Sequence, residues 1–454
     1  MSRSRKKGTS TGTVIAAIII IIIIAGLALY LGKSGGGGTT TTSSIPPTST
    51  SATQSSSQTT TTQQKLEIVK IGALLPLTGD LQSFGKSNQI SLKQAENDIN
   101  AWLKDQGANF RIEVEVVDSQ TDPTVAVQQF DTLYQEGIRY FIGPMSSGEL
   151  SQIVSIIQQG EEAVVISQSS TAPSLAIKDT VYRFPPPDEL QGKALADLYK
   201  ADGVTHIVIA YRNDDWGSGL AGFVEKYFKE DGGTVANKIP YDPKASNFDN
   251  LVQSIASAVQ NLEQEGVSAD KIGVELISFD EASQILATAS NYNVLKQVKW
   301  YGSDGTALSQ GVAQNPDAAE FAVTVHWKNT ITFGLTNKTG KVFCEIKKQL
   351  GYTPDPYSLI AYDALWVMTM AIKEAGGPHA TPSAVAAKIP DVVKTYEGVT
   401  GKIVLNQYGD RKYSDYAIFE IVKENGKYQW KLTEIYKFEQ HKFEKITENP
   451  LKCS

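Results

Sequence analysis

An uncharged apolar run near the N-terminus, from Val14 to Leu31, constrains this chain more than any other feature. An α-helix over that range would be roughly 27 Å long, which matches the hydrocarbon core of a bilayer. Four basic side chains lie within residues 1–13, and such residues favour the cytoplasmic side of a membrane. The sequence therefore predicts a cytoplasmic basic segment over 1–13, a transmembrane anchor over 14–31 and a body outside the cell.

Two forms of this N-terminal segment stay open. A secretory signal peptide would usually have a shorter apolar run followed by a cleavage site of small residues, and no such site follows Leu31. Residues 6–11 resemble the class III, pilin-like signal of archaeal surface proteins, in which a peptidase cuts after the glycine, here Gly8. The apolar helix would stay attached after that cut, so the cut and uncut forms both predict an anchor.

Residues 32–64 join the apolar run to the body and are rich in Ser and Thr. A segment with so few apolar side chains cannot bury enough surface to offset the entropy lost on ordering. This composition is typical of an extended, flexible stalk. We therefore expect the body to be held close to the membrane surface.

The body shows the repeating pattern of an α/β protein. Apolar strand-like runs such as Ile68–Leu75 alternate with amphipathic stretches such as Ser87–Leu103, and the rhythm restarts after residues 185–187 with His206–Tyr211. Such alternation predicts parallel sheets flanked by helices. About 390 residues exceed what one hydrophobic core usually supports, so we expect two sheets with a cleft between them.

Composition excludes several classes of protein. The formal net charge is −7, which argues against a nucleic-acid partner. Neither Cys-x-x-Cys, His-Glu-x-x-His nor Gly-x-Ser-x-Gly occurs, so we predict no metal, no cofactor and no catalytic residue. The two cysteines, Cys344 and Cys453, are equally compatible with a disulfide and with free thiols outside the cell.

Polar residues follow several of the predicted strands. Ser146 and Ser147 follow one strand, residues 167–171 end another, and residues 212–217 and 302–305 do the same in the second half. Ligands of open α/β sheets bind beyond the carboxyl ends of the strands. These segments are therefore the candidate binding residues.

Motifs in a fixed order carry a resemblance to a known family. They are Ile71-Gly72-Ala73-Leu74-Leu75-Pro76-Leu77-Thr78-Gly79, Phe84-Gly85, Asn97-Asp98-Ile99-Asn100, Val117-Asp118, Asp122-Pro123, Ile142-Gly143-Pro144, Trp216-Gly217 and Tyr301-Gly302. Together they resemble the leucine/isoleucine/valine-binding protein family, the type I periplasmic solute receptors of ABC importers. The resemblance extends over about residues 68–416.

The resemblance implies a two-lobed type I periplasmic binding protein that closes like a flytrap. Each lobe would be a parallel sheet flanked by helices, and the chain would cross between lobes three times. The expected boundaries are residues 66–186 with 332–396 for lobe 1, 187–331 with 397–440 for lobe 2, and 441–454 for a C-terminal tail.

The resemblance also assigns the ligand's charged groups. The family's carboxylate-binding serine and threonine fall on Ser147 and Thr171, assisted by backbone N–H groups near Ser170, and Ser146 is a further hydroxyl at the same helix start. Hydroxyls and amides at a helix N-terminus can bind an anion without a full positive charge. The ammonium partner falls on Asp304, where the family has a glutamate, one methylene longer.

Aromatic positions complete the predicted site. Phe84, Trp216 and Phe279 fall where the family places rings against the ligand side chain. Structural roles stay open for several candidates: Ser146 and Ser147 as helix N-caps, Asp304 as a turn residue, Trp216 as packing between the lobes, and Phe84 as ordinary core.

The resemblance implies a receptor and not an enzyme. We expect it to capture an amino acid or a related amide, most of all a branched-chain amino acid, and to deliver it to the permease subunits of an ABC transporter. The N-terminal helix would hold it at the cell surface. Two alternatives are kept: a surface adhesin or pilus-like protein, suggested by the signal segment and stalk, and a tethered surface hydrolase.

Overall fold

The computed structural model describes residues 66–448 and 450–453. The predicted basic segment, anchor and stalk lie outside these residues. Among the described helices, none combines the length and the apolar character that crossing a bilayer requires.

The first sheet is parallel throughout and has the strand order β2-β1-β3-β4-β5. Its strands are β1 (Glu67–Leu75), β2 (Phe110–Asp118), β3 (Tyr140–Ile142), β4 (Val164–Ser167) and β5 (Val181–Arg183). The interior strand β1 is apolar and buried after Lys70, as expected for a strand covered on both faces.

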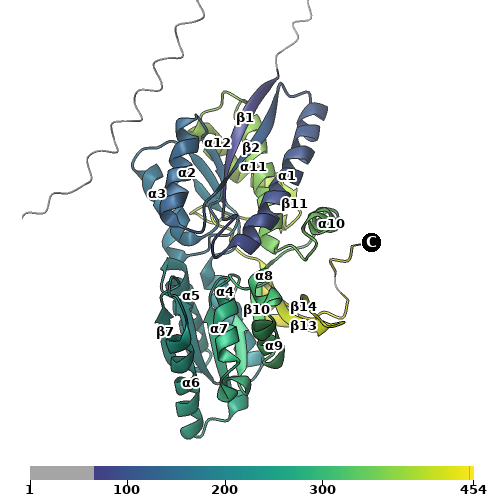
Figure 1. The fold of residues 1–454 in the computed structure, drawn as a ribbon. Coiled ribbons are helices and arrows are strands. Elements are labelled where there is room, and N and C mark those ends of the chain that lie inside the picture. Colours follow the sequence, from purple (N-terminus) through teal and green to yellow (C-terminus); the bar gives the residue numbers. More distant parts are fainter. Residues whose placement is uncertain (1–65, 449, 454) are drawn as a thin grey trace, which may run out of the picture. The chain divides into compact units, whose positions relative to one another are not determined.

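Helices from two separate stretches of the chain cover this sheet (Figure 1). They are α1 (Gln82–Asp105), α2 (Pro123–Gln135), α3 (Ser147–Gln158), α10 (Thr339–Leu350), α11 (Pro356–Glu374) and α12 (Pro382–Thr395), with the short η1 (Pro173–Leu175). Helix α11 packs against α1, β3 and β4 and is buried around most of its circumference. We call this sheet with its helices the first lobe.

The second sheet has eight strands in the order β15-β14-β13-β10-β9-β8-β6-β7. Its strands are β6 (His206–Arg212), β7 (Thr234–Tyr241), β8 (Ile272–Ile277), β9 (Lys299–Gly302), β10 (Lys328–Phe333), β13 (Asp415–Glu424), β14 (Lys427–Lys437) and β15 (Lys442–Lys445). The helical elements of this half are α4 (Asp188–Ala201), α5 (Asp215–Glu230), α6 (Asp249–Gln264), α7 (Ala282–Ala289), α8 (Gln310–Gln314), α9 (Pro316–Thr324), η2 (Ala269–Lys271), η3 (Asn293–Lys296) and η4 (Phe438–Gln440). This is the second lobe.

The resemblance led us to expect a parallel sheet in each lobe. The second sheet differs, because it contains both parallel and antiparallel strands. Strand β13 runs antiparallel to β10, and β14 and β15 continue the antiparallel pairing. Asn425 and Gly426, both with positive φ, form the two-residue loop between β13 and β14. Asn-Gly is the preferred sequence for such a hairpin turn.

The chain crosses from one sheet to the other three times: after β5, after β10 and before β13. The small β11 (Glu397–Gly398) and β12 (Gly401–Lys402) precede the last of these crossings. A buried ion pair joins two of the crossing segments: Arg183 Nε lies 2.6 Å from Asp410 Oδ1.

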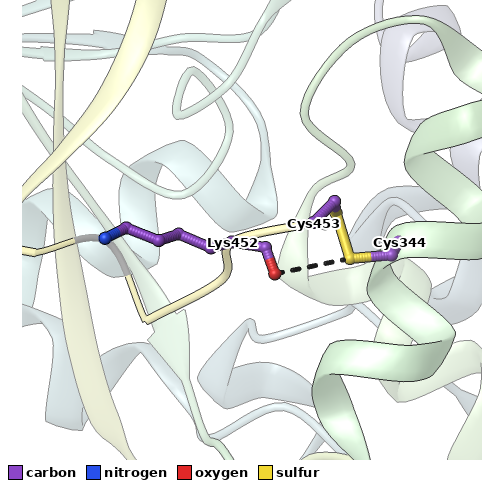
Figure 2. The surroundings of a disulfide bond; sticks show 3 residues. All are labelled: Cys344, Lys452 and Cys453. Atoms are coloured by element: carbon purple, nitrogen blue, oxygen red, sulfur yellow. Dashed lines mark hydrogen bonds between the residues drawn. A yellow bond between two sulfur atoms is a disulfide. The ribbon is translucent and has the colours of Figure 1, made fainter.

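The lobe boundaries expected from the sequence remain a proposal. Two observed contacts bear on where those boundaries lie. Residues 399–400 donate both backbone N–H groups to Asp363 of α11, so this stretch packs with the first lobe. Residues 442–445, expected in a tail, pair with β14 as strand β15. After β15 the chain reaches α10, where Cys453 forms a disulfide with Cys344 (Figure 2).

Candidate functional site

A pocket lies where the carboxyl ends of both sheets meet. Its cavity volume is about 20 Å³, enough for about one water molecule and far below the range for small-molecule sites, so an amino acid fits only if the residues lining it move apart. Strands β3, β4, β6, β8 and β9 each lead into a lining segment. The lining residues are Leu81, Phe84, Met145, Ser146, Ser147, Ser169, Thr171 and Tyr357 from the first lobe, and Trp216, Phe279, Asp304 and Gly305 from the second.

One side of the pocket presents hydroxyls and helix-start amides. Ser147 is the first residue of α3, and its Oγ accepts the backbone N–H groups of Thr171 at 3.2 Å and Ala172 at 3.1 Å. The hydroxyl of Thr171 is buried and has no partner in hydrogen-bonding geometry among the described residues. These neutral groups suit a carboxylate, which the N-terminus of a helix also favours.

Two neighbouring serines have structural roles in this arrangement. Ser146 caps α3 in a capping box, because its Oγ accepts from the N–H of Glu149 at 3.3 Å and donates to Oε2 of Glu149 at 2.8 Å. Ser169 lines the pocket and donates to the carbonyl of Met145 at 2.6 Å. The Ser146 hydroxyl is therefore committed to its helix.

The opposite side of the pocket presents a buried carboxyl group. Oδ2 of Asp304 accepts a hydrogen bond from the hydroxyl of Tyr357, across the two lobes, while Oδ1 finds no partner within the described part of the chain. Burial raises the pKa of Asp304 to about 6. A desolvated carboxyl with an unused acceptor is suited to receive a cationic group.

Aromatic rings lie between these two polar sides. Trp216 stacks on Phe279 with centroids 4.6 Å apart, and the guanidinium of Arg212 lies 4.0 Å from the centroid of Phe279. Gly305 allows this packing, since a Cβ there would lie 2.6 Å from the Trp216 ring. With Leu81, Phe84 and Met145, the rings form an apolar surface for a ligand side chain.

Contacts between the lobes surround the pocket, so the structure represents a closed arrangement. Ser83 on α1 donates to Oδ2 of Asp280 at 2.9 Å and accepts the N–H of Gln310 at 3.3 Å. Asp280 also accepts from Ser309, and its burial raises its pKa to about 6. Arg212 bridges to Asp80 of the first lobe at 3.3 Å.

The structure brings seven of the eight predicted site residues to this one pocket. They are Phe84, Ser146, Ser147, Thr171, Trp216, Phe279 and Asp304. Ser170 is not among the lining residues; its hydroxyl donates to the carbonyl of Met145 at 3.1 Å and its N–H to Ser167 Oγ at 3.1 Å. Its neighbours Ser169 and Thr171 line the pocket instead.

Sequence reasoning did not find Tyr357, which lines the pocket, and gave no role to Asp188, which is buried and is not among the lining residues. Tyr357 lies in the first turn of α11, and the N-cap Asp355 with Pro356 marks that helix start. Asp188 is the first residue of α4 after three prolines, and its N–H donates to the carbonyl of Thr171 at 3.0 Å. An acidic residue at a helix start is common, so neither signal alone indicates a ligand.

A metal site is not indicated in the part of the chain described. No group of three or more His, Cys, Asp or Glu side chains in residues 66–448 and 450–453 is arranged to hold an ion. The pocket itself presents hydroxyls, backbone amides, aromatic rings and the carboxyl of Asp304.

Fold and pocket together define a two-lobed ligand-binding protein of type I periplasmic architecture. The family model described as the receptor family ligand binding region matches residues 88–424. The chain belongs to that family and, within it, to the leucine/isoleucine/valine-binding proteins, as its motifs indicated.

Individual relatives cover most of the chain. An uncharacterized protein of Methanocaldococcus jannaschii is 31% identical over 389 residues, which cover 82% of this chain and 90% of that protein. The leucine-, isoleucine-, valine-, threonine- and alanine-binding protein of Pseudomonas aeruginosa is 24% identical over 364 residues, 78% of this chain and 90% of its own length.

A solved structure shares the fold. It is the branched-chain amino acid transporter substrate-binding protein LivJ of Streptococcus pneumoniae, in complex with isoleucine. It superposes with a TM-score of 0.66 at 18% identity and covers 81% of this chain and 99% of its own. This similarity supports the two-lobed architecture.

Proposed function

We propose that this chain is an extracellular receptor that captures an amino acid between its lobes and delivers it to the permease of an ABC importer. A branched-chain amino acid is the first candidate. One observation carries the proposal: Ser147 and Thr171 of the first lobe line the same pocket as Asp304 of the second. Donors for an anion and an acceptor for a cation thus face each other across the cleft.

The chemistry of this arrangement matches a zwitterion with an apolar side chain. Neutral donors around Ser147 and Thr171 would hold the α-carboxylate, and Asp304 would hold the α-ammonium, as a charge-assisted hydrogen bond. The Trp216–Phe279 stack and Phe84 would contact the side chain. Burial excludes water, which strengthens each of these interactions.

We further propose that residues 14–31 anchor the receptor in the cytoplasmic membrane, with residues 32–64 as a stalk and the binding lobes outside. This proposal rests on the apolar run and the basic residues before it. Such an anchor would keep the receptor near its permease.

A thermal-shift screen of the purified protein against the twenty common amino acids tests the function. A ligand at a hundred times its Kd would stabilise the folded state by about 2.7 kcal/mol. We expect a shift with one amino acid or a small related group, without consumption of the ligand. Turnover of the ligand would favour the hydrolase, and absence of any shift would favour the adhesin; either result would contradict the proposal.

A further inference from the structure

One sequence motif of the chain has no part in the pocket between the lobes. Asn337-Lys338-Thr339 is the only Asn-x-Ser/Thr sequence in the chain, and such a sequence is the acceptor for N-linked glycans on exported proteins. It lies where the chain leaves β10 and enters α10. The surroundings of its two functional side chains decide whether it can carry a glycan.

The acceptor side chain is accessible, whereas the hydroxyl of the motif is enclosed. Asn337 is exposed, and Thr339 is only 1% exposed. The Thr339 hydroxyl accepts the N–H of Thr336 at 2.7 Å and donates to the carbonyl of Val399. A glycan on Asn337 can therefore extend into solvent, but an enzyme that must engage the Thr339 hydroxyl can reach it only before this part of the chain has folded.

Asn337 also lines a surface hollow that contains aromatic rings. The hollow has a volume of about 390 Å³, which is within the range of small-molecule sites. Tyr362 and Trp366 of α11 line it together with Tyr396, which follows α12. Trp366 and Tyr396 are half-buried. Ring surface is therefore available directly beside the acceptor side chain.

Polar and charged groups surround these rings. Asp98 of α1 accepts a hydrogen bond from the Tyr362 hydroxyl at 2.8 Å, and Lys338 donates to the carbonyl of Glu397 at 2.6 Å. Lys341, in the first turn of α10, is exposed and also lines the hollow. A sugar ring has an apolar face of C–H groups and an edge of hydroxyls that donate and accept. Aromatic rings suit the face, and the charged groups suit the edge.

The hollow is separate from the pocket between the lobes. The two share no lining residue. The residues of the hollow come from α1, α10, α11 and the stretch 396–399, all on the side of the first sheet. A group that fills the hollow would therefore leave ligand binding and the closing of the lobes undisturbed.

We propose that Asn337 carries an N-linked glycan whose first sugars lie in this hollow against Trp366 and Tyr396. This inference rests on the proposed function, because it needs the lobes to be outside the cell. The donor is a lipid-linked oligosaccharide. A bond forms between Nδ2 of Asn337 and the anomeric carbon of the first sugar, and the bond from that carbon to the lipid phosphate breaks. The phosphate leaves with the bonding electron pair, and the amide loses one proton. Transfer precedes the folding of α10, because the folded chain encloses the Thr339 hydroxyl.

Mass spectrometry of the full chain tests the modification. The chain is produced in an archaeal host that glycosylates exported proteins, beside Asn337→Gln and Thr339→Ser. We expect a glycan on the native chain and on Thr339→Ser, which keeps the motif, and none on Asn337→Gln. Protease added to intact cells shows whether the lobes are outside. Lobes outside without a glycan would overturn this inference alone. Lobes inside would overturn the extracellular location and the glycan together, while the amino acid screen tests ligand binding independently.

Two further measurements test the place of the glycan and the order of events. Oxidation of Trp366 and Tyr396 by hydroxyl radicals should be about threefold lower in the glycosylated chain than in Asn337→Gln, because sugar rings would cover these faces. Tyr413, which is 41% exposed and does not line the hollow, should be oxidised equally in both. Equal oxidation of Trp366 in both chains would overturn the seat in the hollow. Folded, unmodified chain incubated with host membranes and lipid-linked oligosaccharide should stay unmodified, and its modification would overturn the proposed order.

Discussion

The two carboxyl oxygens of Asp304 have different surroundings, and this difference predicts how a substitution of Asp304 affects ligand binding. Tyr357 binds Oδ2, while Oδ1 is left without a partner among the described residues. Replacement of Asp304 by Asn should weaken binding of the amino acid by more than tenfold, or about 1.4 kcal/mol, because the ammonium loses its counter-charge. Calorimetry measures this directly, and an unchanged Kd would remove Asp304 from the site.

Ser147→Ala is the matched comparison for that variant. The Ser147 hydroxyl accepts the N–H groups of Thr171 and Ala172, and these donors remain for a carboxylate when the hydroxyl is removed. We therefore expect a smaller loss than for Asp304→Asn. The reverse order would contradict the assignment of the two subsites.

Predicted site residues line the pocket where a strand end and a family motif coincide. Ser147, Trp216 and Asp304 are of this kind, and all three line the pocket. Ser170 does not; its hydroxyl donates to the carbonyl of Met145, and the motif does not give that orientation. Tyr357 was missed because its importance comes from its hydrogen bond to Asp304, which lies 53 positions away along the chain.

At the scale of elements, the capping box of α3 separates a structural from a ligand-binding role for Ser146. Its hydroxyl is bound to Glu149 in both directions. Ser146→Ala should lower the free energy of unfolding by about 1 kcal/mol through loss of the N-cap, with less than a threefold change in Kd. Denaturant unfolding and calorimetry measure the two effects, and a tenfold change in Kd at unchanged stability would instead make Ser146 a ligand residue.

The disulfide fixes the end of the chain to α10. Cys344 and Cys453 are 109 positions apart, and the Cys344 sulfur lies 3.8 Å from the carbonyl oxygen of Lys452 (Figure 2). Closing so long a loop restricts the unfolded chain, and such bonds typically contribute about 2–4 kcal/mol. Cys344→Ser should lower stability by that amount in non-reducing buffer. In the presence of reductant, the variant and the native chain should have the same free energy of unfolding. Equal free energies without reductant would mean that the bond does not constrain the unfolded state.

Buried parallel strands were easier to predict from the sequence than the antiparallel strands of the second sheet. Buried parallel strands such as β1 and β6 are long apolar runs and stand out in the sequence. Strand β13 and its antiparallel partners have mixed composition. Their main local signal is the Asn425-Gly426 turn, which was not used. The pairing of β13 with β10 joins distant segments, so no local pattern indicates it.

At the scale of the whole molecule, buried carboxyls should make stability depend on pH. Burial raises the pKa of Glu275 to about 8 and that of Glu149 to about 7. At such sites the folded state binds protons more tightly than the unfolded chain, so their contribution is complete below the ordinary pKa and is lost as pH rises through the raised value. We expect the unliganded protein to melt at progressively lower temperature between about pH 5 and pH 8.

Carboxyls with the opposite shift do not cancel this trend. Hydrogen bonds from Thr78 and nearby backbone outweigh burial at Asp118 and lower its pKa, so its contribution is lost only below about pH 4. Glu275→Gln should flatten the pH dependence, and the exposed Glu230→Gln should not. A melting temperature that rises from pH 5 to pH 8 would contradict the assigned burial effects.

The most direct test of the account is a crystal structure of the protein grown with L-leucine. We expect the amino acid between the lobes, with its carboxylate at Ser147 and Thr171, its ammonium at Asp304, and its side chain against Trp216. A cleft filled by the protein's own side chains, with leucine absent or bound elsewhere, would contradict the proposal that this pocket is a receptor site.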